Sequence, residues 1–551
     1  MNKFLITPLA VSLFALQGCD TNNSISDAAT ENSSPLTHMD NSWYVESAAK
    51  VEDIHTAMTQ LSKNRGAAKN IILFIGDGMS IGTVTAARIL DGQQKGMSGE
   101  ENSLSFGHFP FTGLSKTYNV DAQTPDSAGT MTAIISGVKT DVGVIGLNEN
   151  VVMGDCSSGQ GNELMTALEL AEIAGLSTGV LTTTSITHAT PAATYAKAAD
   201  REWDDDSRMP AEAIASGCQD IASQLINFES NLQAKFEGLN TDGIDGIEVV
   251  MGGGRKHFLP ADAAANSADA RSEIEGDRSD GRNLVEEWQA IYPDGTYIDQ
   301  QSGFDALDRN AQGPVFGLFN ESHMLYEADR GNDIAGEPSL TEMTRLAIDV
   351  LDNNPKGYFL MVESGRIDHG HHASSAYNAL TDTIEFSQAI QAAVDSTNPD
   401  ETLIIVTADH SHVFTIAGYP RRGNPILGKV IDVGTTELAK GLDDLPYTTL
   451  GYANGLGFQD LGDETNADRR YYSEPFEGRA DLTDIDTQAS GYHQEALMPM
   501  SLETHSGEDV AVYATGPGAH LVSGTQEQTA IFHVMNFAGD LVTKAEAALA
   551  Q

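Results

Sequence analysis

The sequence has 551 residues, of which 79 are Asp or Glu and 31 are Lys or Arg, so its formal net charge is -48 at pH 7. This balance argues against a nucleic-acid-binding surface, because neutralising phosphates requires clustered Lys and Arg side chains. Hydrophobic residues make up 40% of the chain, enough for one large domain with an insert or for several domains.

The first residues are typical of a bacterial export signal. Lys3 precedes an apolar stretch at 4–16 that is too short to span a membrane. The sequence L-Q-G-C at 16–19 resembles a lipoprotein processing box and predicts that Cys19 is lipidated. Gln17 is a less usual member of that box, so simple cleavage and release is the alternative. We therefore expect an exported protein, either periplasmic, anchored to a membrane by a lipid at Cys19, or present at the cell surface or secreted.

Two segments separate this signal at 1–19 from the main part of the chain. Residues 20–41 are rich in Asn, Ser, Thr and Asp, which predicts a flexible tether. Residues 42–61 have an amphipathic helical pattern with Ser42 as a plausible N-cap residue. We assign 42–62 to an N-terminal helical arm.

Strand-like and helical patterns then alternate along the chain. Strand-like apolar runs occur at 71–75, 178–183, 248–251, 358–362, 403–407 and 510–513. Helical patterns occur at 81–90, 128–136, 163–174, 341–353 and 376–395. Continuous apolar strands between helices predict an α/β fold with a large, mainly parallel central sheet flanked by helices on both faces. Ligands of such sheets bind beyond the carboxyl ends of the strands.

The segment 421–500 differs in composition. It is rich in Gly, Asp, Asn, Tyr and Arg and has weak periodicity, so we predict an inserted, crown-like subdomain there. The catalytic domain is then expected at 63–420 and 501–551. Outside the signal, the chain has two cysteines, Cys156 and Cys218. In an exported protein two such cysteines usually pair, and two free thiols are the alternative.

The segment 363–372 carries the strongest chemical signal. It reads E-S-G-R-I-D-H-G-H-H and directly follows an apolar run. Because the chain has 15 His in total, three within four positions are not expected by chance. Asp368 and His372 are four apart, so one helical turn would point both at the same ion. A divalent metal site is predicted, and a polar loop with chance histidines is the alternative.

Similar groups of residues stand at other strand ends. Asp77 lies between two glycines after one apolar run, and Asp409 and His410 follow another. Ser127 begins a helical pattern, where it could be an N-cap residue or a nucleophile next to an anion site. Arg201 could bind a tetrahedral oxyanion or could pair with neighbouring surface acids. Together they predict a site with Zn²⁺ and Mg²⁺ that supports in-line phosphoryl transfer.

The motifs resemble those of the alkaline phosphatase family, in its animal and marine bacterial branch, from about residue 43 to the end of the chain. They are G-D-G-M, D-S-A-G-T, H-A-T-P-A-A-T-Y-A, G-G-G-R-K, E-S-G-R-I-D-H-G-H-H, T-A-D-H-S-H-V-F and E-T-H-S-G-E-D-V, in this order. The resemblance implies hydrolysis of small phosphomonoesters through a phosphoserine at Ser127, with Arg201 binding phosphate. It also implies two Zn²⁺ and one Mg²⁺ per subunit, a disulfide and a homodimer.

The resemblance also implies metal ligands, position by position. The first zinc would be held by Asp368, His372 and His505, the second by Asp77, Asp409 and His410, and magnesium by Asp77, Thr190 and Glu363. His188 and His369 would lie behind these ligands. Thr190 stands where this branch more often has Ser, and it keeps the hydroxyl group.

One departure and several alternatives remain at this point. Relatives from animals have a fourth, calcium-like site with a Phe-Glu pair, whereas this chain has Phe319-Asn320, so the lost carboxylate makes that site doubtful. The arm and the insert would contribute to the dimer. A phosphodiesterase or sulfatase of the same superfamily is the alternative enzyme, and a metal-binding surface lipoprotein is the alternative from another class.

Overall fold

The computed structural model describes residues 67–309 and 313–551, together with Val45, Ala49, Thr56 and Thr59. The predicted export signal, with Cys19, and the predicted tether lie outside the described residues. Most of the predicted arm at 42–62 does so too, and the four described residues within it are helical. These three assignments stay predictions.

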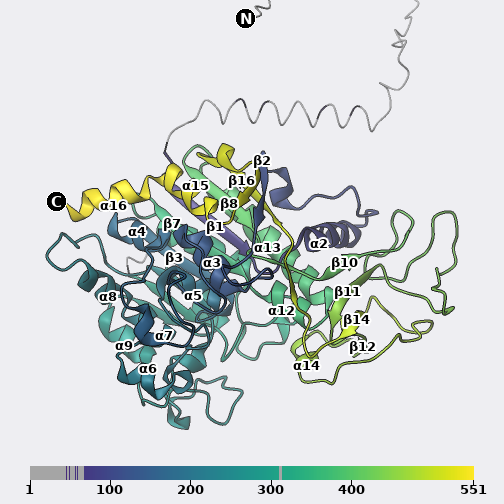
Figure 1. Cartoon of the computed structure of the whole chain (residues 1–551), viewed down its shortest axis with the longest axis horizontal. Coiled ribbons are helices and arrows are strands. Elements are labelled where there is room, and N and C mark those ends of the chain that lie inside the picture. Colours follow the sequence, from purple (N-terminus) through teal and green to yellow (C-terminus); the bar gives the residue numbers. More distant parts are fainter. Residues whose placement is uncertain (1–44, 46–48, 50–55, 57–58, 60–66, 310–312) are drawn as a thin grey trace, which may run out of the picture. The chain divides into compact units, whose positions relative to one another are not determined.

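A ten-stranded sheet forms the centre of the described domain (Figure 1). Its strand order is β17-β2-β16-β8-β1-β7-β3-β4-β6-β5. The neighbouring strands are parallel except around β16, which is antiparallel to both β2 and β8. The predicted mainly parallel α/β sheet is therefore confirmed. The strands are β1 (Asn70–Gly76), β2 (Phe111–Lys116), β3 (Ser177–Ser185), β4 (Val249–Gly253), β5 (Thr296–Ile298), β6 (Val315–Leu318), β7 (Tyr358–Ser364), β8 (Thr402–Thr407), β16 (Val510–Thr515) and β17 (Gly524–Glu527).

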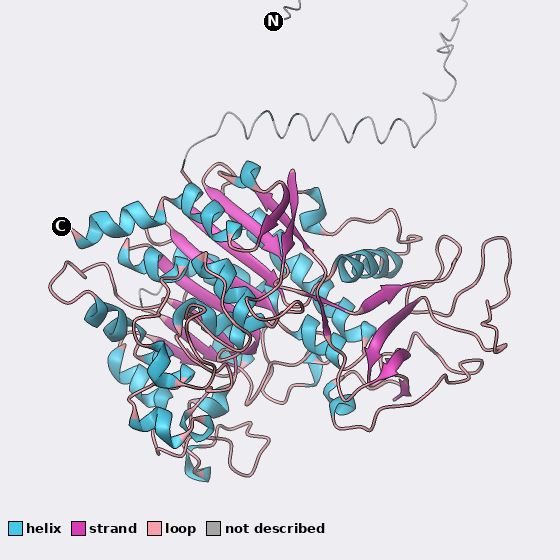
Figure 2. Cartoon of the chain, in the orientation of Figure 1, coloured by secondary structure: helices cyan, strands magenta, loops and turns pink. Residues whose placement is uncertain are grey.

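Helices cover both faces of this sheet, as Figure 2 shows. Successive residues of β1 face opposite layers: Ile71 and Leu73 belong to one hydrophobic core, and Ile72 and Phe74 to the other. The first core contains residues of α3 (Ser127–Ser136), α4 (Ala167–Ile173), α5 (Ala189–Tyr195), α7 (Ile221–Ile226), α8 (Phe228–Lys235), α9 (Leu284–Ile291), α15 (Ala530–Gly539) and α16 (Leu541–Leu549). The second contains residues of α2 (Ile81–Gln94), α10 (Gln301–Asp305), α11 (Leu340–Leu351) and α13 (Ala376–Ser396).

The six predicted strands and the five predicted helices are all present, with ends that differ by a few residues. The largest differences are of four residues: α2 ends four residues after its predicted end, and α4 begins four residues after its predicted start. Thr166 caps this helix and exchanges hydrogen bonds with Glu169 in a capping box, which sets the start at Ala167. None of the helices in the described ranges combines the length and apolarity that a membrane span requires.

The region predicted as an insert has a small sheet of its own and long loops. Strands β10 (Phe414–Ile416), β11 (Leu450–Gly455) and β14 (Ala496–Pro499) form one sheet, and β12 (Gln459–Asp460) pairs with β13 (Tyr492–His493). The short helix α14 (Asp468–Tyr471) lies in the same region. β10 begins seven residues before the predicted boundary at 421, because its pairing with β11 extends the small sheet toward the central one.

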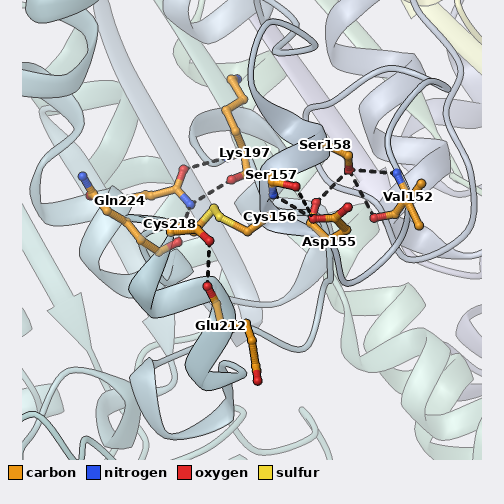
Figure 3. Close-up of a disulfide and its surroundings, with 11 residues drawn as sticks. Val152, Asp155, Cys156, Ser157, Ser158, Lys197, Glu212, Cys218 and Gln224 are labelled. Carbon is orange, nitrogen blue, oxygen red and sulfur yellow. Dashed lines mark hydrogen bonds between the residues drawn. A yellow bond between two sulfur atoms is a disulfide. The ribbon is translucent and has the colours of Figure 1, made fainter.

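Cys156 and Cys218 form a disulfide with a Cα–Cα distance of 6.1 Å, which confirms pairing over two free thiols (Figure 3). The bond joins residues 62 positions apart. Nearby, the backbone of Lys197 is held by Gln224, which accepts from its N–H at 2.8 Å and donates to its carbonyl at 3.0 Å. The covalent loop contains Arg201, so the bond restricts the segment that carries this side chain.

One buried and one partly buried carboxyl group meet at the amino-terminal edge of the sheet. Thr178 donates its hydroxyl to Glu172, which is fully buried, and its backbone N–H to Glu248 Oε2 at 2.6 Å. Burial raises the pKa of Glu248 to about 8. Burial and the proximity of Glu248 raise the pKa of Glu172 well above its usual value. Part of this edge is therefore stabilised by carboxyl groups that keep their protons near neutral pH.

Candidate metal centre

Three neighbouring strands of the sheet, β8, β1 and β7, end in the acidic and imidazole residues that the sequence singled out. Asp77 follows β1, Glu363 lies at the end of β7, and Asp409 follows β8, and all three side chains are buried. Gly78, directly after Asp77, has a φ of 66°, and a Cβ at this position would lie 2.4 Å from the His412 ring. Only glycine lets the chain turn so closely against the site.

Ser127 is the first residue of α3, and its hydroxyl points into the same region. The N-cap residue is Asp126, whose carboxylate accepts from the N–H of Gly129 at 3.1 Å. Ser127 Oγ lies 3.0 Å from His410 Nε2 and 3.4 Å from Asp77 Oδ1. The capping alternative for this side chain is therefore wrong, because Asp126 performs that role.

A first group of possible ligands consists of Asp368, His372, His412 and His505, whose ligating atoms lie within 4.8 Å of one another. Asp368 and His372 belong to α12 (Arg366–His372), one turn apart, with an Oδ2–Nε2 distance of 3.3 Å. His505 Nε2 lies 3.1 Å from His372 Nε2 and 3.4 Å from Asp368 Oδ1. β9 (Ser411–His412) and β15 (His505–Ser506) pair antiparallel and bring the last two histidines together.

His412 is the residue of this group that was not predicted from the sequence. Its Nε2 lies 2.6 Å from Asp368 Oδ1 and its Nδ1 2.5 Å from Glu503 Oε2. Burial opposes its protonation, but these two acids together raise the pKa of His412 to about 10. The second histidine of A-D-H-S-H, two residues after His410 and directly behind a strand end, was the available signal.

A second group of possible ligands contains Asp77, Asp368 and His410, and Asp409, which the sequence predicted here, lies beside it. His410 Nε2 lies 3.3 Å from Asp77 Oδ1 and 3.4 Å from Asp409 Oδ2. Asp409 is oriented by the backbone N–H of Gly78 at 3.2 Å and by the hydroxyl of Thr130 at 3.0 Å. Burial lowers the pKa of His410 well below its usual value, so its ring is neutral at neutral pH and can ligate a metal.

A third group joins Asp77, His188 and Glu363. Glu363 Oε2 accepts from the hydroxyls of Thr182 and Thr184. Glu363 Oε1 and Thr190 Oγ1 are buried and make no hydrogen bond of normal geometry within the described residues. Burial raises the pKa of Glu363 to about 7, although nearby threonine hydroxyls oppose this. Two buried oxygens without a regular partner fit an oxygen-binding cation such as Mg²⁺.

The combined electrostatics of the three groups also fit divalent cations. Burial, followed by the negative charges of Asp409, Asp368 and Glu363, raises the pKa of Asp77 well above its usual value. Four carboxylates this close repel one another unless cations lie between them. Burial lowers the pKa of His372 to about 4, so this ring also offers a neutral nitrogen. Carboxylates and imidazoles without cysteine are ligands that suit Zn²⁺ and Mg²⁺ together.

Arg201 lies beside this centre. Its Nη1 is 3.1 Å from Asp126 Oδ2, and its Nη2 is 3.3 Å from His188 Nε2. The surface acid Glu202 is farther away, at 3.8 Å. The main partner of Arg201 is therefore the N-cap residue of the Ser127 helix, which directs the guanidinium toward the same site.

His369 and His371 lie behind the candidate ligands: the His369 ring is 5.6 Å from that of His188, and the His371 ring is 4.9 Å from that of His412. His369 Nδ1 bonds Arg366 Nη1 at 2.6 Å. His371 bonds the Thr83 hydroxyl and the Tyr452 hydroxyl, each at 2.9 Å. This pairing gives His371, to which the sequence assigned no role, a structural function between two elements.

The insert contacts α12 directly. Asp468 of α14 binds Arg366 Nη2 at 2.7 Å, and the Tyr471 hydroxyl donates to the carbonyl of His369 at 2.9 Å. The Arg366 guanidinium also lies 3.7 Å over the ring of Tyr326. The helix that carries Asp368 and His372 is therefore held from the insert side as well as from the sheet.

Two further places hold side chains that could in principle ligate a metal. Asn320 is buried, and its amide lies 3.4 Å from Glu337 Oε2. The described residues show no group of three acid or imidazole ligands there. Asp205, His257 and Asp277 do form such a group, but His257 Nδ1 bonds Asp205 at 2.6 Å and Asp277 pairs with Lys256 at 3.3 Å. The carboxylates of Asp205 and Asp277 therefore already have neighbouring side-chain partners.

Known proteins agree with this picture. A family model described as alkaline phosphatase matches residues 68–541. The tissue-nonspecific alkaline phosphatase isozyme of Gallus gallus is 41% identical over 490 residues, covering 88% of this chain and 87% of the relative. An alkaline phosphatase of Gadus morhua is 41% identical over 493 residues, covering 89% and 95%.

Solved structures support the fold. The alkaline phosphatase of Thermus thermophilus has a TM-score of 0.58 at 24% identity, covering 88% of this chain and 97% of that one. A cold-active alkaline phosphatase of a Shewanella species has a TM-score of 0.55 at 23% identity, covering 85% and 98%. With motifs, fold and animal relatives in agreement, this chain belongs to the alkaline phosphatase family.

Proposed function

We propose that the chain hydrolyses phosphomonoesters to an alcohol and inorganic phosphate, with Ser127 as the nucleophile. Family membership gives the reaction class. The observation that supports the nucleophile most directly is the position of Ser127 Oγ, 3.0 Å from His410 Nε2 and 3.4 Å from Asp77 Oδ1. A hydroxyl between two possible metal ligands, at the start of a helix, can attack a bound phosphoryl group.

The metal ions are part of the proposal. We assign the first zinc to Asp368, His372 and His505, the second to Asp77, Asp409 and His410, and magnesium to Asp77, Thr190 and Glu363. Three divalent ions would add roughly six positive charges to the pocket and offset the acidic surface where the anionic substrate enters. Zinc bound there would polarise the phosphoryl oxygens and lower the pKa of a nearby hydroxyl group.

The residues of the chain then perform two displacements. Ser127 Oγ attacks phosphorus in line with the ester oxygen, whose bond to phosphorus breaks, and a phosphoserine forms. The proton of the Ser127 hydroxyl passes to solvent, and the departing alcoholate takes a proton from water. Arg201, held by Asp126, donates hydrogen bonds to two of the phosphoryl oxygens and stabilises the charge that develops on them. A water molecule next attacks the phosphoserine, restores Ser127 and releases inorganic phosphate.

Replacing Ser127 with Ala tests the nucleophile. Turnover of an aryl phosphate should fall by on the order of 10³ or more, because the covalent route is lost. Acid-quenched wild-type enzyme should carry a phosphoryl group, seen by intact-mass spectrometry, and the variant should not. Ser136→Ala, at the other end of α3, is the matched control and should keep the label. A covalent phosphoryl intermediate in Ser127→Ala would sink the assignment.

The ester class is tested by comparing the turnover of three substrates. Arg201 and the three metal groups favour a doubly charged monoester over a diester or a sulfate. The enzyme should therefore turn over an aryl phosphate much faster than an aryl phosphodiester or an aryl sulfate. Faster turnover of the diester or the sulfate would favour the alternative enzyme class.

Export, lipidation at Cys19 and a homodimer belong to the same proposal. The boundaries at 421 and 500 for the crown-like insert are proposed with them. Large apolar side chains are exposed on this insert, including Leu497 at 82% and Met498 at 52%, and a second subunit would cover them. Size-exclusion chromatography with light scattering tests the dimer, and mass spectrometry of the mature N-terminus tests the lipid.

A further inference from the structure

A cavity of about 210 Å³ adjoins the proposed phosphate-binding arginine. Its walls include Arg201 and His188, which also border the metal centre. Arg201 is bonded in turn to Asp126, the residue before Ser127. Since one water molecule takes about 30 Å³ of liquid, the cavity has room for a tetrahedral or planar anion beside a bound phosphoryl group.

The cavity has the opposite charge balance to the rest of the chain. Its walls carry three cationic side chains, Arg201, Arg208 and Lys256, against two acidic ones, Glu202 and Asp204. In the whole sequence, acidic residues outnumber basic ones by 79 to 31. Asp126 and Asp277 pair with Arg201 and Lys256 from outside the walls, so the positive excess belongs to the lining itself, which an entering anion meets first.

The two outer cations are only loosely paired. Arg208 Nη1 lies 3.8 Å from Glu202 and 3.6 Å from Asp204, and Lys256 Nζ lies 3.3 Å from Asp277. Charge-assisted hydrogen bonds are shorter, at about 2.7–2.9 Å. Asp204 instead accepts a 2.6 Å hydrogen bond from Thr187. Loose pairs at a partly exposed position are weak, so Arg208 and Lys256 can turn their N–H groups to an incoming anion at little cost.

We propose that this cavity binds a second anionic group of the substrate, a phosphate or a carboxylate a few bonds away from the phosphoryl group that is cleaved. Arg208 and Lys256 are then specificity residues for bisphosphates and phosphorylated acids. The inference rests on the proposed function, because it needs Arg201 to hold the reacting phosphoryl group beside the cavity.

Three substrates with the same carbon skeleton test it: glycerol 3-phosphate, glycerol 1,3-bisphosphate and 3-phosphoglycerate. In Arg208→Gln and Lys256→Gln, KM for the last two should rise about ten-fold, the scale of one lost charged hydrogen bond. KM for glycerol 3-phosphate and kcat for all three should stay within about two-fold. Arg309→Gln is the control, since it removes the same charge at an exposed position whose ion pair is with Asp349.

The outcomes are separable. A rise confined to the bisphosphate supports the site and restricts its occupant to phosphate, whereas a rise for both doubly anionic substrates supports any anion. Equal rises in KM for all three substrates, or a similar effect of Arg309→Gln, would show that the two cations act only by long-range attraction. Either result would overturn the inference. Unchanged KM values would overturn it too. Failure of the proposed function would look different, because wild-type enzyme would then not hydrolyse glycerol 3-phosphate at all.

Discussion

Glu248→Gln should make the protein less sensitive to alkaline pH. The carboxyl of Glu248 has a pKa of about 8 in the folded chain, against an ordinary value of 4.5. A carboxyl whose folded pKa is raised stabilises the fold fully below the unfolded pKa, and this contribution is lost as pH rises toward the folded value. The sensitive window is therefore roughly pH 4.5 to 8.

The size of the effect follows from the same values. A pKa difference of about 3.5 corresponds to about 5 kcal/mol at most, since each unit is worth about 1.4 kcal/mol. Glu248 is partly open to solvent, which screens its charge, so we expect about half of that. Two acids face Glu248. The charge of Asp245 helps to raise the pKa of Glu248, and the charge of Glu248 helps to raise the pKa of Glu172. Gln keeps the shape of the side chain but has no charge to bury.

Urea denaturation at pH 5.5 and pH 8.5, with metal in excess, measures this. Wild-type protein should lose about 1.5–2 kcal/mol more than Glu248→Gln between the two conditions, because about 2.5 of the 3.5 pH units of the window lie between them. Glu546→Gln, at an exposed position of α16, is the control and should behave as wild type. Equal losses in wild type and Glu248→Gln would refute the reasoning, because the buried carboxyl would then carry no share of the pH dependence.

Three further changes give independent checks. Arg201→Lys should raise KM for an aryl phosphate about ten-fold or more and weaken inhibition by inorganic phosphate, because a single ammonium cannot bind two oxygens at once; unchanged inhibition would contradict its role. Asp468→Asn should speed the loss of zinc to a chelator, which a zinc-sensitive dye follows, while the melting temperature changes little. Zinc loss at the wild-type rate would show that the contact with Arg366 does not hold α12. Cys156→Ser should lower the free energy of unfolding by about 4 kcal/mol, a value that follows from the 62-residue separation of Cys156 and Cys218. Urea unfolding with and without reductant measures this change. Equal stability with and without the bond would contradict the prediction.

Much of the fold was predictable because the β1, β7 and β8 strands are continuous apolar runs, and the chemistry follows each of them at once. The antiparallel insertion of β16 was not predictable, since its pairing with β2 and β8 depends on segments far apart in the sequence. Strands such as β5 are three residues long, which is too short to give a periodic signal.

The residues of the candidate site also fall into those that the sequence predicts and those that only the structure shows. Asp77, Asp368 and Asp409 could be found because each stands directly after a strand or in a dense motif. The capping role of Asp126, which leaves the Ser127 hydroxyl to the site, depends on the local backbone and is visible only in the structure. The place of His412 depends on its pairing with His505 across β9 and β15. The contact of Asp468 with Arg366 joins residues 102 positions apart, and nothing local in the sequence marks it.

The two-residue ladder between β9 and β15 has a consequence for how the protein is made. The candidate ligands run from Asp77 to His505, and the last of them is set in place by its pairing with His412. A nascent chain can form β1, β7 and β8 while this ladder is still missing, because these strands precede residue 505 and are synthesised before it. The first metal group is then incomplete until nearly the whole polypeptide has emerged. Metal capture would thus mark the end of folding, and a chain truncated before His505 would keep most of its sheet yet lack a ligand for the first zinc.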